Sequence, residues 1–171
     1  MDKPYEHARM SRSVGLLISM LVRYPELGTV RLDPACQTLK FTFLVTRLLE
    51  EEDFTSLKDH IRSALDAYTY LMDKPIETAD VARESYDDLT VLTVTRDVQS
   101  LSQEEISLLI EILRSRFKRH LVADFNESLL EEDLLMQEQI IGEMLEDLRD
   151  TVQEKNLIAF REGGRVLVFN K

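Results

Sequence analysis

The chain has 171 residues, 44% of them hydrophobic, and a formal net charge of −11 at pH 7. This length suits one sizeable hydrophobic core, and the acidic balance excludes broad non-specific binding to nucleic acid, which requires a positive surface. The single cysteine, Cys36, excludes an intrachain disulfide and a metal site built from several cysteines.

The first predicted element is a helix over residues 9–24, and Pro25 ends it because proline disfavours helical backbone at the preceding residue. Its apolar residues recur at helical spacing: Met10, Val14, Leu17, Ile18 and Leu21. The apolar run 14–22 is too short to cross ~30 Å of hydrocarbon, and no signal-peptide cleavage site follows it. We therefore expect a cytoplasmic protein with no membrane partner.

Residues 29–33 and 38–46 are predicted to form a β-hairpin around the turn-rich segment 33–37. Apolar and polar residues alternate along the second strand, as is typical of a strand with one buried face. The apolar set is Leu39, Phe41, Phe43 and Val45.

A helix is predicted over residues 55–73 and a third strand over the β-branched run 89–95. Residues 74–88 hold few large apolar side chains and are predicted to be a loop. If strands 38–46 and 89–95 are parallel, the helix between them forms a right-handed βαβ crossover.

Ser102 and Glu105 form a capping box at the start of a helix over residues 102–122. A second helix is predicted over residues 127–155, which hold ten acids and two bases. The short connection between these helices predicts an antiparallel helical hairpin. The last turns of the longer helix, from Leu148, would then extend past the shorter one.

Gly163 and Gly164 separate the apolar strands 157–161 and 165–169, which predicts a second β-hairpin. The predicted class is therefore α+β. A sandwich-like subdomain over residues 1–100, with a sheet of about three strands, would pack with residues 101–171 as one domain.

Catalytic signatures are absent from the sequence: it has no glycine-rich phosphate loop and no zinc-binding or nucleophile motif. Its histidines, His7, His60 and His120, come from three different segments, although zinc sites often use two ligands one helical turn apart. We therefore predict no catalytic, cofactor or metal residue. A carboxylate metalloenzyme is the weakest alternative, and it would rest on acid pairs one helical turn apart: Glu127 with Glu131, Glu143 with Asp147, and Asp150 with Glu154.

Positive charge is concentrated at residues 114–120, with Arg114, Arg116, Lys118 and Arg119 as candidate phosphate contacts. A local alternative pairs this run with Glu131, Glu132 and Asp133 across the predicted helical hairpin.

The order helix, hairpin, helix, strand over residues 9–95 is similar to that of type II KH-like RNA-binding modules, although the G-x-x-G loop of many such modules is missing. This resemblance implies RNA as a partner. The same element order also fits small regulatory domains that dimerise through a sheet or a helix. The long acidic helix is unlike a DNA-recognition helix, which excludes DNA.

The absence of catalytic motifs and the excess helix length indicate a non-enzymatic interaction or regulatory protein that forms a homodimer. The predicted interface is the end of the long helix and the C-terminal hairpin, where strand 165–169 can present an unpaired edge. Its candidate residues are Leu148, Val152, Val166 and Val168. The alternative is an RNA- or ribosome-associated assembly factor that uses the basic run.

Overall fold

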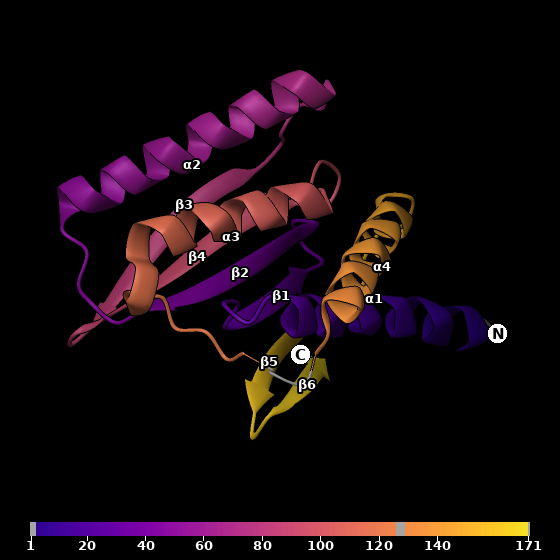
Figure 1. Ribbon diagram of the computed structural model, residues 1–171. Coiled ribbons are helices and arrows are strands. Elements are labelled where there is room, and N and C mark those ends of the chain that lie inside the picture. The colour runs from indigo at the N-terminus through magenta and orange to yellow at the C-terminus, as the bar shows by residue number, and fades with distance from the viewer. Residues whose placement is uncertain (1–2, 126–128, 171) are drawn as a thin grey trace.

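The computed structural model describes residues 3–125 and 129–170, with side chains from residue 12 onward. The α+β class is confirmed: helices and strands pack around one core (Figure 1). In chain order the elements are α1 (Lys3–Arg23), β1 (Thr29–Asp33), β2 (Thr38–Val45), α2 (Glu51–Met72), β3 (Ala79–Tyr86), β4 (Leu89–Asp97), α3 (Gln103–Phe117), a 3-10 turn (Lys118–His120), α4 (Glu131–Arg149), β5 (Leu157–Glu162) and β6 (Arg165–Asn170).

The strands form one six-stranded sheet in the order β3-β4-β2-β1-β5-β6, with every neighbouring pair antiparallel. The prediction of about three strands is therefore wrong. The βαβ crossover is wrong too, because β2 and β4 are antiparallel neighbours. The β1–β2 hairpin is confirmed, and the C-terminal hairpin joins the same sheet through β5 and β1.

Strand β3 occupies most of the segment that was predicted to be a loop. It lies at an edge of the sheet, and Val81 is its only buried residue. An edge strand with so little buried surface needs few apolar side chains, so the hydrophobic pattern gives almost no signal there. Because β3 intervenes between α2 and β4, the element order compared with KH-like modules is not the observed one.

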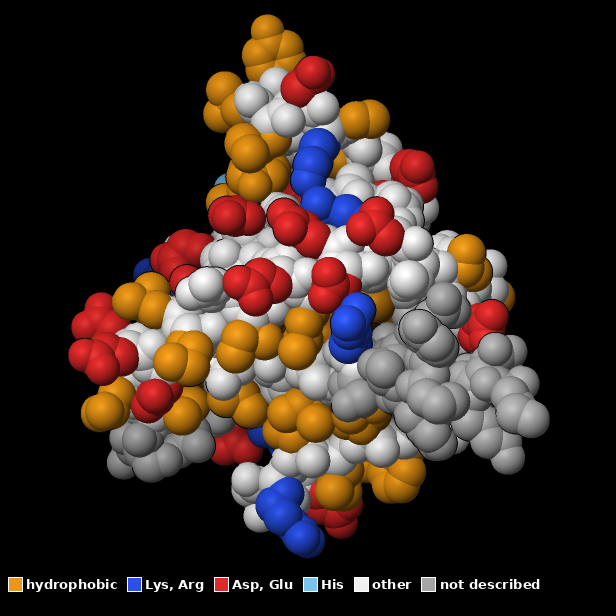
Figure 2. Space-filling view, turned by 90° about the vertical axis from the view of Figure 1, so that its right-hand side faces the viewer, with side chains coloured by type: hydrophobic (Ala, Val, Ile, Leu, Met, Phe, Trp, Pro, Cys, Tyr) orange, Lys and Arg blue, Asp and Glu red, His pale blue; other side chains and the backbone are white. Residues whose placement is uncertain are grey.

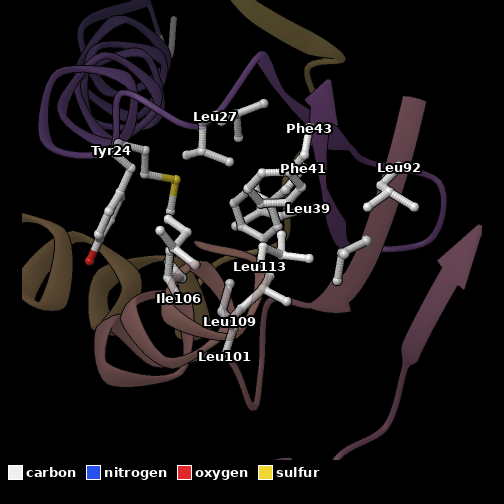
Figure 3. Close-up of a cluster of buried hydrophobic side chains, with 14 of the residues drawn as sticks. Tyr24, Leu27, Leu39, Phe41, Phe43, Leu92, Leu101, Ile106, Leu109 and Leu113 are labelled. Atoms are coloured by element: carbon white, nitrogen blue, oxygen red, sulfur yellow. The ribbon is translucent and has the colours of Figure 1, made fainter. Parts of the chain in front are cut away.

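The two faces of the sheet differ in what covers them. Buried residues alternate along β1, β2 and β4, and their side chains point toward the helices: Val30, Leu32, Leu39, Phe41, Phe43, Leu92 and Val94. Figure 3 shows part of this core, where Phe41 and Phe43 meet Leu109 and Leu113 of α3. The opposite face carries the half-buried residues Arg31, Lys40, Thr42, Thr93 and Ile158, and we call it the open face.

The predicted helical hairpin of residues 102–122 and 127–155 is wrong. Helix α3 ends at Phe117, and Leu121 then bridges to Val45, so the chain leaves the helix layer for the sheet. Helix α4 packs chiefly on α1. A small residue allows this close approach, because a Cβ on Gly15 would lie 3.2 Å from Met144 Cε. The Arg23–Glu138 ion pair, at 2.5 Å, joins the same two helices.

Helix α4 has 19 residues and is shorter than the predicted helix at both ends. At its start the Leu130 backbone N–H donates to the Asp133 carboxylate at 3.0 Å, and residues 126–128 lie outside the described part of the chain. At its end the chain turns after Arg149 to reach β5. None of the described helices is long and apolar enough to cross a membrane.

Candidate functional site

The C-terminal hairpin, β5 and β6, is joined to α1 by a half-buried arginine. Arg161 donates hydrogen bonds to the backbone carbonyls of Leu21, Tyr24 and Leu27, at and just after the end of α1. The last carbonyls of a helix have no intrahelical partner, so a cation there is favourable. Burial lowers the pKa of the Arg161 guanidinium, and the carboxylates of Asp124 and Glu26 oppose that shift. The hairpin is thus held in a defined orientation against α1.

A pair of glutamines holds the connection between α4 and β5. The Gln153 backbone N–H donates to Gln37 Oε1 at 3.0 Å, and Gln37 Nε2 donates to the Gln153 carbonyl at 2.9 Å. Ser13 Oγ donates to Gln153 Oε1 at 3.1 Å, which adds α1 to the arrangement. With Gln153 turned inward, its neighbour Val152 is directed to solvent and is 73% exposed.

A cavity of about 220 Å³ lies between α1, the end of α4 and this connection. Its charged lining residues are of both signs, Arg12 and Lys155 against Asp147 and Glu154, and its buried polar residues, Ser13 and Gln153, bond to each other. Among the described residues that line it there is no pair of a nucleophile and a histidine base, so these residues indicate no reaction class.

The hairpin register determines which backbone groups of β6 face away from the sheet. Gly163 and Gly164 both have positive φ, 59° and 78°, and form a two-residue turn between the paired residues Glu162 and Arg165. Such a turn is closed by a hydrogen-bonded pair, and hydrogen-bonded pairs then alternate along the strands. Arg165, Leu167 and Phe169 therefore bond to β5. The N–H and C=O groups of Val166, Val168 and Asn170 point outward, and we call these three residues the outer edge.

The side chains along β6 are mainly apolar. The run from Val166 to Phe169 is uncharged, and Phe169 is 52% exposed. On the open face, Phe169 stacks on Phe160 with ring centroids 5.5 Å apart, and Ile158 and Leu167 lie on the same face. An exposed strand edge that is neither charged nor bulged is a template for pairing with another strand.

The four predicted interface residues have different surroundings. Leu148 is 4% exposed and belongs to the core, whereas Val152 faces solvent beside the end of α4. Val166 and Val168 are half-buried against the core, and their backbone groups form part of the outer edge. The sequence prediction did not include Asn170, Ile158, Phe160, Leu167 or Phe169. The two-residue Gly-Gly turn could have indicated these residues. It determines which side chains share a face of the hairpin and which backbone groups of β6 point outward.

The basic run does not form the predicted pairs with Glu131, Glu132 and Asp133. Arg114 instead contacts the buried carboxylate of Glu26 at 2.5 Å and Glu111 at 3.3 Å, and Arg116 donates to Ser56 Oγ at 2.9 Å. The side chains of Lys118 and Arg119 are exposed and make no ion pair or hydrogen bond with the described residues. Only these two of the four candidate phosphate contacts keep a side chain free of such partners.

A buried ion-pair network lies at the junction of β4 and α3. Arg96 and Glu105 are 2% and 1% exposed, and Arg96 donates to both Glu105 oxygens at 3.1 and 3.3 Å. The Asp97 carboxylate accepts from the backbone N–H groups of Thr78 and Ser100. Because these groups satisfy one another, the network holds the start of β3 against α3 and offers no reactive group.

Among the described residues, no group of three or more His, Cys, Asp or Glu side chains could hold a metal ion. Glu127, which belongs to one of the candidate acid pairs, lies outside the described part of the chain. His60 and Cys36 are exposed, and half-buried His120 lies against Thr46.

Comparisons with family models, curated proteins and solved structures found no match to this chain. The class is therefore defined by the structure alone. It is an α+β protein in which helices cover one face of a six-stranded antiparallel sheet. The outer edge of β6 is uncharged from Val166 to Phe169.

Proposed function

We propose that this chain is a non-enzymatic cytoplasmic interaction protein that forms a homodimer through its C-terminal hairpin. The observation that carries the proposal is the outer edge of β6, where outward backbone groups accompany an uncharged run from Val166 to Phe169. Such an edge exposes donors and acceptors to water in one copy and can pair them in a complex.

The neighbouring surface supports the same assignment. Phe160 and Phe169 form a stacked apolar pair beside the edge, and Val152 is exposed at the end of α4. Aromatic side chains of this kind are enriched at protein interfaces. Arg161 and the Gln37–Gln153 pair hold the hairpin in place before any partner arrives, which lowers the ordering cost of association.

A second apolar surface lies on the side of the molecule formed by α1 and α4. Figure 2 shows hydrophobic side chains across this side next to a row of acidic ones. The exposed apolar residues of α4 and its N-cap are Leu130, Leu135 and Met136. Acidic residues flank these side chains along the helix, and a helix has no outward row of unpaired backbone groups, so the hairpin remains the stronger candidate.

The test is the mass in solution by size-exclusion chromatography with light scattering. One chain is 19.9 kDa, and we expect a species of twice that mass at micromolar concentration. Phe169→Lys places a charge beside the outer edge and should shift the population to monomer. Ala82→Lys is the matched control, because Ala82 is also exposed on the open face of an edge strand. A wild-type monomer at 100 µM, or equal loss in both variants, contradicts the proposal.

A second candidate function is RNA binding through the basic run. Exposed Lys118 and Arg119 favour it, because neither has a charged partner among the described residues. Replacing Arg114, Arg116, Lys118 and Arg119 by glutamate should then abolish salt-dependent binding to structured RNA. Because Arg114 also holds buried Glu26, the double variant of Lys118 and Arg119 is the cleaner experiment. Unchanged RNA binding in that variant would remove this candidate.

A further inference from the structure

We infer that the dimer is one continuous twelve-stranded sheet, in which β6 of one copy pairs antiparallel with β6 of a second copy about a two-fold axis at Val168. This inference rests on the proposed self-association and specifies its geometry.

The backbone groups limit the possible registers. In an antiparallel pair, outward residues must face outward residues, so Val166, Val168 and Asn170 of one copy must meet the same set in the other. With Val168 opposite Val168, Val166 lies opposite Asn170 on both sides of the axis. All three outward residues are then used, which gives about six hydrogen bonds at two per hydrogen-bonded pair. A shift by two residues places Asn170 opposite Gly164 of the turn, where the strand has ended.

The side chains are compatible with this register. Leu167 of one copy lies opposite Phe169 of the other on the open face, and this contact occurs twice. Cross-strand pairs of apolar and aromatic residues stabilise a sheet. The stacked Phe160–Phe169 pairs of the two copies then join into one apolar surface that spans the axis. The sole charged residue of β6, Arg165, lies outside the paired stretch from Val166 to Asn170.

The outer edge of β6 is better suited to pair with β6 of a second copy than with β3, the strand at the other edge of the sheet. Strand β3 carries Asp80, Arg83 and Glu84, whose charges oppose pairing with an apolar strand. A contact between β6 and β3 would also be head-to-tail, and such contacts continue into filaments unless the rotation closes a ring. Pairing of β6 with itself uses the same surface twice and closes at two copies.

The test is disulfide crosslinking of single-cysteine variants in a Cys36→Ser background, since Cys36 is exposed. Val168→Cys should form a disulfide-linked dimer, because directly opposed residues have Cα atoms about 5.5 Å apart, within the range for disulfides. A mixture of Leu167→Cys and Phe169→Cys should form the mixed dimer. Leu167→Cys alone should crosslink poorly, because diagonal neighbours lie about 7–8 Å apart. Ala82→Cys, on strand β3, measures random collision.

The outcomes separate this inference from the proposed function. Efficient crosslinking of Leu167→Cys alone, with little for Val168→Cys, would overturn the register. A dimer by light scattering with crosslinking no better than for Ala82→Cys would overturn the β6 pairing but leave self-association in place. A monomer in every variant and in the wild type would remove both. Circular dichroism of each variant confirms that a negative result is not caused by unfolding.

Discussion

The two edges of the sheet differ in composition, although both end an antiparallel array. Strand β3 exposes Asp80 and Glu84, and its Arg83 reaches back to Glu51 and to the Leu49 carbonyl. Strand β6, at the other edge, has an uncharged run from Val166 to Phe169. Charged residues on an edge prevent pairing with other chains. The difference indicates that charge opposes strand pairing at β3 but not along the uncharged run of β6.

The edges also differ in how they are held. The start of β3 is bonded to a buried network, through the Thr78 backbone and the Arg96 and Asp97 side chains. The β5–β6 hairpin is held by Arg161 on the carbonyls at the end of α1. Both anchors are charge-assisted, but only the network at β3 is fully buried. Removing one partner from that network should therefore lower the free energy of unfolding more than removing Arg161 from the hairpin.

The largest expected effect comes from removing that buried partner. Glu105→Ala leaves the Arg96 guanidinium buried without its carboxylate and should destabilise the fold by about 3–5 kcal/mol. Chemical denaturation monitored by circular dichroism measures the free energy of unfolding. Glu104→Ala is the matched control, because Glu104 is exposed in the same helical turn. Equal costs for the two variants would mean that the network does not anchor β3.

The next largest effect concerns the outer edge. Val168→Pro removes the N–H at the proposed axis, and we expect dimer affinity to fall about 10- to 100-fold, since two hydrogen bonds of roughly 1 kcal/mol are lost. The monomer should keep its fold, because proline is tolerated where an edge N–H faces solvent. Ser85→Pro is the control, since alternation along the β3–β4 hairpin also places its N–H outward. Sedimentation measures the dissociation constants. If both variants dimerise like the wild type, the prediction is wrong.

The charge difference between the two edges can also be removed. Replacing Asp80 and Glu84 by valine removes acids from the β3 edge, and we expect species larger than a dimer because both edges are then available. Light scattering over a concentration series detects them. If the double variant stays at the wild-type mass, charge is not what keeps the β3 edge solitary.

The smallest expected effect is that of salt. The C-terminal segment 155–171 holds four basic residues and one acid, a net charge of +3, whereas the whole chain is at −11. Hairpins that meet as proposed bring like charges together, so screening should tighten the dimer by about 2- to 5-fold between 50 and 500 mM NaCl. RNA binding through Lys118 and Arg119 would weaken over the same range. A dimer that dissociates at high salt would contradict the hairpin interface.

Strongly local features were predictable from the sequence. The alternation from Leu39 to Val45 indicated β2, the capping box of Ser102 and Glu105 indicated the start of α3, and Gly163-Gly164 indicated the last hairpin. Each depends on contacts within a few residues or on one backbone conformation. The basic run was visible as well, but which carboxylates it would meet depended on a helix pairing that does not form.

The sequence by itself determined the α+β class, the β1–β2 and β5–β6 hairpins, and the uncharged run of residues 166–169, because these are properties of short segments. The tertiary structure decided that β2 and β4 are antiparallel neighbours, that α4 packs on α1, and that β6 lies at the sheet edge. The physical reason is that each of these depends on which distant apolar surfaces bury each other. Between α1 and α4, Gly15 lies beside Met144 and Arg23 pairs with Glu138, contacts that the hydrophobic pattern of either helix alone could not match.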